Sequence, residues 1–94
     1  MSLTFEWDED KARANQRKHR VSFEEAKTVF NDPLSLTIVD EAHSSEEQRY
    51  IDIGRSSSGR VLLVAYTERG TNIRLISSRK ATASERRQYE EGSE

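Results

Sequence analysis

The residues best suited to chemistry lie in the second half of the chain. Between Ile53 and Ala81 there are six Lys and Arg residues and a single acid, Glu68. The six cations are Arg55, Arg60, Arg69, Arg74, Arg79 and Lys80. A guanidinium group can bind a phosphate through two parallel hydrogen bonds, so a surface that gathers several of them suits a nucleic-acid backbone better than an apolar ligand.

This basic stretch contrasts with the charge of the whole chain. The 94 residues carry 15 Lys and Arg against 17 Asp and Glu, a net charge of -2. Residues 1–50 have 7 cations against 11 acids, whereas residues 51–94 have 8 against 6. Such a balance argues against a protein that coats nucleic acid with its whole surface and favours one local basic face.

Most catalytic templates are absent from the sequence. There is no cysteine, which excludes disulfides, thiolate zinc sites and a Cys nucleophile. The four glycines stand singly, so there is no glycine-rich phosphate loop, and no nucleophile elbow is present. The two histidines, His19 and His43, are isolated in the sequence. We therefore expect neither a metal site nor a cofactor.

Cleavage of RNA through the substrate's own 2′-hydroxyl is the chemistry that this residue set allows. The protein then has to orient the phosphate, stabilise the extra negative charge at phosphorus and move protons. Arginines suit the first two tasks, and Glu68, beside Arg69, is a candidate general base. His19 could also carry a proton, but the helix dipole explains a histidine at a helix end equally well. The alternative is that the charges only solvate an exposed face of a sheet. From the residues alone, the two interpretations are equally supported.

The elements that must position these residues begin with polar segments. Alternating apolar residues predict a short strand over residues 3–7. Asp8 is typical of an N-cap for a helix over residues 9–19, which has acids in its first turn and cations in its last. Because Ala12 and Ala14 are the apolar residues of this helix, we expect it to lie on the surface.

A second helix carries clearer signals. Ser22 and Glu25 have the spacing of a capping box, and Pro33 ends the helix after residues 31–32. Its apolar residues recur every three or four positions: Phe23, Ala26, Val29 and Phe30. This spacing predicts the helix that packs on the sheet.

Alternating or continuous apolar runs predict four further strands, over residues 34–40, 49–54, 61–67 and 72–78. The first is expected to be half-buried, with Ile38 among its inward residues, and the third, the most hydrophobic run of the chain, to be central. The connections are expected at 41–47, 56–59 and 68–71. Thr82 and Glu85 predict a capping box for a last helix that ends near residue 89 or 91, followed by a frayed end at 92–94.

The fold predicted for residues 1–94 is a single α+β domain. It has an antiparallel sheet of about four strands plus a short N-terminal strand, two N-terminal helices and one C-terminal helix. We expect helices on one face of the sheet and exposed cations on the other. Arg74 and Arg79 are five residues apart and point to opposite faces of a regular strand, so without a bulge only one, Arg79 by preference, joins the site.

Ten short segments together make a specific pattern, although none is a strong motif alone. They are Phe5–Asp8, Arg17–His19, Val21–Ala26, Val29–Phe30, Asp32–Pro33, Ile53–Ser56, Thr67–Arg69, Ile73–Ser77, Arg79–Ala81 and Glu85–Arg86. In this order and spacing the chain resembles the BrnT family of bacterial type II toxins essentially end to end. The resemblance implies a small ribonuclease with a RelE-like fold that cleaves RNA and inhibits translation.

The resemblance also implies site residues. Glu68, Arg69, Arg79 and Lys80 correspond to the family's catalytic positions. Many family members have two arginines at the last pair, and Lys80 keeps the charge there but loses the bidentate fork. Further RNA-binding residues are expected among the other cations and one histidine: Arg55, Arg74, His19 and Lys18.

The expected partner is a BrnA-like ribbon-helix-helix antitoxin, which would form a hetero-oligomer with this chain. No apolar run approaches the roughly 18 residues that span a bilayer, and the acidic start lacks a signal-peptide pattern, so we expect a cytoplasmic protein. The competing hypothesis is a non-catalytic module, a degenerate toxin that is held by its antitoxin or binds nucleic acid without cleaving it.

Overall fold

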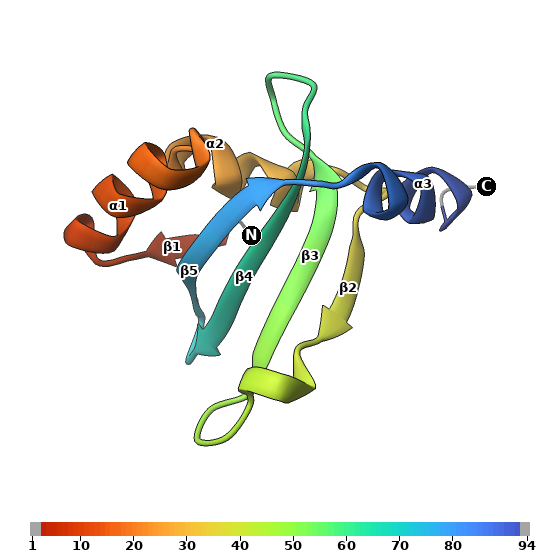
Figure 1. Cartoon of the computed structure of the whole chain (residues 1–94). Coiled ribbons are helices and arrows are strands. Elements are labelled where there is room, and N and C mark those ends of the chain that lie inside the picture. Colours follow the sequence, from red (N-terminus) through yellow and green to blue (C-terminus); the bar gives the residue numbers. More distant parts are fainter. Residues whose placement is uncertain (1–2, 93–94) are drawn as a thin grey trace.

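In the computed structural model, which describes residues 3–92, the sheet has five strands in the order β1-β5-β4-β3-β2 (Figure 1). The strands are β1 (Thr4–Glu6), β2 (Leu36–Val39), β3 (Arg49–Arg55), β4 (Val61–Arg69) and β5 (Asn72–Lys80). β1 runs parallel to β5 and the other neighbours are antiparallel, so the short N-terminal strand joins a mixed sheet. The hydrophobic run of β4 is the central strand, as predicted.

The helices are α1 (Glu9–His19), α2 (Phe23–Ala26), which continues as the 3-10 helix η1 (Lys27–Asn31), the short η2 (Glu41–His43), and α3 (Ala83–Gly92). The N-caps are confirmed. The Asp8 carboxylate accepts from the backbone N–H of Lys11 at 3.0 Å, and the Ser22 hydroxyl accepts from that of Glu25 at 3.0 Å. α3 extends to Gly92, and the rest of the predicted frayed end lies outside the described residues.

The capping box predicted at α2 is wrong for Glu25. Its carboxylate binds the β3–β4 turn, accepting from Ser56 Oγ at 2.7 Å, from Arg60 Nε at 3.0 Å and also from Ser58 Oγ. These hydrogen bonds, that of Arg60 above all, lower the pKa of Glu25 to about 2. Glu25 therefore fastens α2 to the turn. The capping box of α3 is confirmed, with Thr82 N–H donating to Glu85 at 2.8 Å and Glu85 N–H to Thr82 at 3.2 Å.

Alternate residues of β4 enter two separate cores. On one face Leu62, Val64 and Tyr66 pack under α2 and η1. The buried residues of this core are Val21, Phe23, Ala26, Val29, Leu62, Val64, Tyr66, Ile73 and Leu75. On the other face Tyr89 of α3 packs with Ile53, Val61 and Leu63. The expectation of helices on one face only is thus wrong, because α3 covers one end of the second face.

The polar helix α1 is attached through Asn15, which is 7% exposed. Its amide donates to the carbonyls of Val21 and Ser78, each at 2.9 Å, and accepts from Ser78 N–H at 3.0 Å. Because β1 pairs with β5 only at residues 72–74, Asn15 satisfies the edge of β5 beyond that pairing. A helix with little apolar surface is thereby fixed to the sheet.

A β-bulge in β5 changes which residues share a face. Tyr66 pairs with Leu75 and Ala65 with Ser77, which leaves Ile76 as the extra residue. The separation of Arg74 and Arg79 was predicted for a strand without a bulge, and the bulge instead brings both to the face away from α2.

The turn expected at residues 68–71 is shorter than predicted. β4 continues through Arg69 and β5 begins at Asn72, so the turn is Gly70–Thr71, with a left-handed φ of 60° at Gly70. Glu68 and Arg69 therefore lie in a strand, where consecutive side chains point to opposite faces.

The expected half-burial of the strand after Pro33 is also wrong, because β2 is an edge strand. Leu36 is half-buried, but Ile38 is 51% and Val39 43% exposed. No helix among residues 3–92 has the length and apolar character needed to cross a membrane.

Candidate functional site

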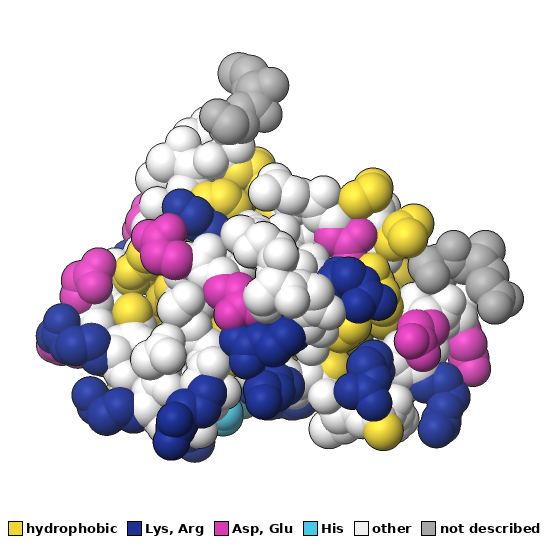
Figure 2. Space-filling view, turned by 90° about the horizontal axis from the view of Figure 1, so that it is seen from above, with side chains coloured by type: hydrophobic (Ala, Val, Ile, Leu, Met, Phe, Trp, Pro, Cys, Tyr) yellow, Lys and Arg dark blue, Asp and Glu magenta, His cyan; other side chains and the backbone are white. Residues whose placement is uncertain are grey.

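On the sheet face opposite α2 and η1, the helix α3 covers one end. We call the rest of this face the open face. It consists of these residues of β3, β4 and β5: Arg49, Ile51, Ala65, Thr67, Arg69, Arg74, Ile76, Ser77 and Arg79. The register places Thr67 between Arg49 on β3 and Arg74 on β5. Seen from above, Lys and Arg side chains gather along the lower edge of the molecule, the side toward the viewer in Figure 1 (Figure 2).

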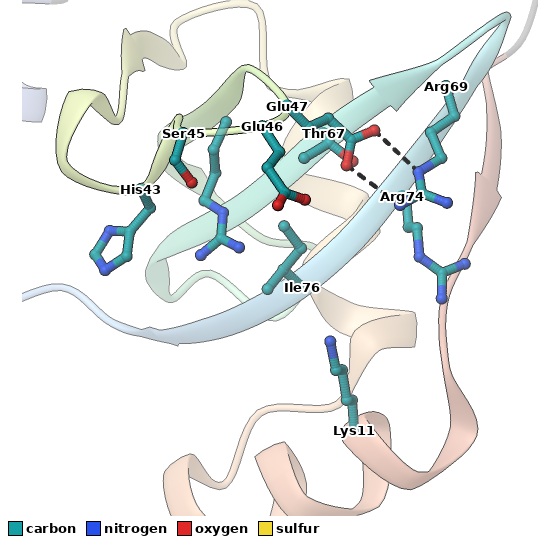
Figure 3. A pocket seen from close by; sticks show the side chains of 10 residues that line it. Lys11, His43, Ser45, Glu46, Glu47, Thr67, Arg69, Arg74 and Ile76 are labelled. Carbon is teal, nitrogen blue, oxygen red and sulfur yellow. Dashed lines mark hydrogen bonds and ion pairs between the residues drawn. The ribbon is translucent and has the colours of Figure 1, made fainter.

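Two neighbouring cavities hollow this face. The first, of about 210 Å³, lies between the sheet, Lys11 of α1 and the β2–β3 loop (Figure 3). Its charged or titratable lining residues are Lys11, His43, Glu46, Glu47, Arg49, Arg69 and Arg74. The second, of about 330 Å³, is lined by Arg79, His19 and Asp40 among others. Arg49 and His43 line both cavities, so the two cavities lie side by side, and together we call them the groove.

Two arginines of the first cavity are held by carboxylates. Arg69 donates to Glu47 from Nε at 3.1 Å and from Nη2 at 3.2 Å, the pair drawn in Figure 3. Arg74 Nη1 lies 2.7 Å from Glu6 Oε2. Hydrogen bonds from Asn72 and Arg74 lower the pKa of Glu6, which keeps this partner ionised.

Arg79 at the second cavity is held in the same way. Its Nη1 and Nη2 each lie 2.9 Å from an oxygen of Glu85. The hydrogen bonds of Arg79 are the main reason that the pKa of Glu85 falls to about 2. Since Glu85 is also the capping residue of α3, the guanidinium is fixed at the rim of the cavity.

Arg49 differs from these three arginines. Its side chain makes no ion pair or hydrogen bond with the part of the chain that the structure describes, and its Nε is buried without a partner. Across the strand pair lies Thr67, 3% exposed, whose Oγ1 is likewise buried without a hydrogen bond. Neither residue is among the predicted site residues. Arg49 lies outside the basic stretch, and the only available signal was a cation at the start of a strand.

Two histidines lie at the groove. His43 Nδ1 is 2.9 Å from Asp40 Oδ2, an interaction that orients the imidazole. His19, the last residue of α1, lines the second cavity with Arg79. Among residues 3–92 no three His, Asp or Glu side chains are close enough together to hold a metal ion.

The structure brings some of the predicted site residues together and separates others. Arg69, Arg74, Arg79 and His19 line the two cavities. Four others do not: Glu68, Lys80, Lys18 and Arg55. Glu68 precedes Arg69 in β4, and Lys80 follows Arg79 in β5. Both side chains therefore point to the sheet face opposite the cavities.

The other two residues, Lys18 and Arg55, are exposed at other places on the surface. Lys18 is an exposed residue of α1. Arg55 is held near α3, with its guanidinium carbon 5.8 Å from the ring centre of Tyr89 and Nη1 donating to Gly59 O at 2.9 Å. The roles of all eight predicted residues stay predictions.

Comparison with known proteins gives two results. The family model described as "Ribonuclease toxin, BrnT, of type II toxin-antitoxin system" matches residues 7–85. The crystal structure of the Brucella abortus ribonuclease toxin, BrnT, superposes with a TM-score of 0.66 at 20% identity, covering 86% of this chain and 99% of that one. At this identity the superposition shows a shared fold. No significant match was found among curated proteins.

Proposed function

The chain belongs to the BrnT family of type II toxin–antitoxin ribonuclease toxins, as the resemblance predicted, and from this premise we propose that it is an endoribonuclease. In this proposal it cleaves RNA by attack of the substrate's 2′-hydroxyl without a metal ion, and inhibits translation in the cytoplasm when it is free of its antitoxin. The observation that carries the proposal is the groove of the open face, where four arginines and two histidines meet.

The arginines would bind the phosphates. Arg69, Arg74 and Arg79 are each oriented by a carboxylate, so little conformational freedom is lost when a phosphate oxygen approaches the guanidinium. Charge that develops at phosphorus during attack would be stabilised by groups already in position. Arg79 is assigned to the scissile phosphate because it lies at the cavity that also contains His19 and His43.

The histidines would carry the protons. One imidazole must accept the proton of the 2′-hydroxyl and another group must donate to the leaving 5′-oxygen, and imidazoles do both near neutral pH. His43 is supported by its hydrogen bond to Asp40, and His19 by its place beside Arg79. Glu68, the base expected from sequence, faces away from the groove and gains no support from this geometry.

A cleavage assay on single-stranded RNA in EDTA tests the proposal. We expect fragments with 2′,3′-cyclic phosphate ends, and loss of cleavage in His19→Ala or His43→Ala protein that still folds. The pairing of three arginines with the protein's own carboxylates favours a second candidate, a module that binds RNA without cutting it. Salt-sensitive RNA binding by folded wild-type protein, with no cleavage at any pH or on ribosomes, would support that alternative.

A type II toxin has an antitoxin, and we propose that here it is a BrnA-like ribbon-helix-helix protein that covers the edge strand β2 in a hetero-oligomer. Leu34, Ile38 and Val39 expose large apolar side chains along this edge, and the strand has unpaired backbone groups on its outer side. Co-expression with the product of the neighbouring gene tests this. Ile38→Asp should weaken the complex, and equal recovery with wild type would place the antitoxin elsewhere.

A further inference from the structure

We propose that Arg49 and Thr67 form a binding site for a phosphate of the RNA in the first cavity, next to the phosphate that is cleaved. This rests on the proposed function but assigns two residues that are not among the eight predicted site residues, although Thr67 lies in one of the segments that carry the resemblance. Arg49 begins β3 and pairs in register with Thr67 of β4, so both side chains project from adjacent strands on the open face.

Arg49 and Thr67 both have unused hydrogen-bonding groups. Buried polar groups in native proteins nearly always find partners, because burial without one costs free energy. Among residues 3–92, the two buried side-chain polar atoms without a hydrogen bond are Arg49 Nε and Thr67 Oγ1. Both atoms belong to residues that line one cavity. Their coincidence there indicates a ligand that supplies the missing acceptor.

Arg49 also differs from the other arginines of the open face. Arg69, Arg74 and Arg79 are each neutralised by a carboxylate of the chain, whereas Arg49 has none. A guanidinium kept half-buried and unpaired does not stabilise the fold. A residue that breaks this rule is expected where function requires it.

The side chains of this cavity determine which kind of ligand it can bind. Arginine offers only donors and the Thr67 hydroxyl can donate, so the ligand must be rich in acceptors. The lining has four Lys and Arg against two Glu, and one of these, Glu47, is already bound by Arg69. Because Arg49 also lines the second cavity with Arg79, a phosphate held by Arg49 and a phosphate at Arg79 fit neighbouring positions of one RNA strand.

Binding of a 2′-deoxy oligonucleotide, which cannot be cleaved through a 2′-hydroxyl, tests the site directly. Arg49→Gln should weaken binding about tenfold and reduce the slope of log affinity against log salt by about one. Thr67→Val, which removes only the hydroxyl, should weaken it by roughly threefold. The matched controls are Arg86→Gln and Thr71→Val, exposed residues that line neither cavity, and both should bind as wild type does.

Unfolding in urea gives the readout that a structural role would change. Because neither side chain has a partner to lose, both variants should be as stable as wild type or more stable. Arg49→Lys, which keeps the charge, should bind with intermediate strength. A weaker-binding variant that is also less stable would make the residues structural and overturn the proposal, as would an Arg49→Gln protein that binds normally.

The cleavage assay separates this proposal from the proposed function. If wild type cleaves RNA, Arg49→Gln should raise KM with a smaller change in kcat, since it removes binding shared by the ground and transition states. Cleavage by wild type with unchanged KM in Arg49→Gln would overturn the phosphate site alone. Binding that depends on Arg49 in a protein that never cleaves would overturn the enzymatic function alone.

Discussion

The two faces of the sheet differ in whether their buried polar groups have hydrogen-bond partners. On the face under α2 and η1, Asp52 is 4% exposed and accepts hydrogen bonds from Thr37 Oγ1 and Tyr66 Oη, each at 2.8 Å. Burial raises the pKa of Asp52, and the two donors limit that cost. On the open face, Arg49 Nε and Thr67 Oγ1 are buried with no donor or acceptor among the described residues.

The two faces also differ in how their side chains pack. The covered face holds a chain of aromatic contacts in which Phe30 lies 5.2 Å from Phe5 and 4.9 Å from Tyr66, and Tyr66 lies 5.6 Å from Tyr50 between ring centres. The two cavities of the open face are lined instead by four arginines and two histidines. A bound anion would complete the charge gathered there.

Truncation of the covered core should have the largest effect. Leu62 is fully buried under α2, and Leu62→Ala should reduce the free energy of unfolding by about 3 kcal/mol through lost burial and a cavity. Ile76→Ala, at the bulge on the open face, should cost less than about 1 kcal/mol because Ile76 borders solvent. Urea unfolding measures both. Equal losses would mean that the two faces contribute alike to stability.

Low pH should reduce the stability of the protein, because it protonates Glu25, which joins α2 to the β3–β4 turn. Its pKa of about 2 lies below the ordinary 4.5, so the stability it contributes is present above pH 4.5 and is lost as the pH falls toward 2. The amount is about 3 kcal/mol for this shift. Glu25→Gln should therefore be less stable than wild type at pH 7 and about equal to it near pH 2. A stability gap that stays constant with pH would contradict this account.

Local signals in the sequence predicted the elements well. The caps at Asp8 and Ser22 and the central strand predicted over residues 61–67 depend on residues close together in the chain. The structure confirms the caps and the central strand, which extends to Arg69. Glu25 was misread because Ser22 three residues earlier gave it a local partner. Its actual partner, Arg60, is brought near only by the packing of α2 against the β3–β4 turn.

The site was less predictable because it depends on register. A single extra residue, Ile76, moves Arg79 to the same face as Arg74. The alternation of apolar and polar residues along a strand does not predict such a bulge. In the proposed phosphate site Arg49 acts together with Thr67. The two residues lie opposite each other on adjacent strands although they are 18 positions apart in sequence. The basic stretch contains Arg69, Arg74 and Arg79, which line the two cavities, but alternation set Arg74 and Arg79 on opposite faces and the stretch does not include Arg49.

Arg79 should matter more for cleavage than for folding. Arg79→Ala should lower kcat about 100-fold if the guanidinium stabilises charge at phosphorus. Its ion pair with Glu85 has a side-chain exposure of 43% on the arginine, so its loss should cost only about 1 kcal/mol of stability. Glu85→Gln separates the two roles, since it removes the ion pair and keeps the guanidinium. A Glu85→Gln enzyme as slow as Arg79→Ala would mean that the pair, and not the arginine, is required.

The smallest expected effect distinguishes local from overall charge. Glu47→Gln frees Arg69 and removes a negative charge from the first cavity, so affinity for the 2′-deoxy oligonucleotide should rise about two- to threefold. The change in stability should stay within about 0.5 kcal/mol. The gain in affinity should disappear at about 0.5 M salt, where exposed charges are screened.

Glu24→Gln is the matched control for that gain. It makes the same change in net charge on α2, where Glu24 lies 3.0 Å from Lys27 and lines neither cavity of the open face. Because α2 packs on the covered side of the sheet, Glu24→Gln should leave oligonucleotide affinity nearly unchanged. An equal gain in both variants would mean that the overall charge of the protein controls binding. A gain confined to Glu47→Gln would support binding of the nucleic acid at the open face.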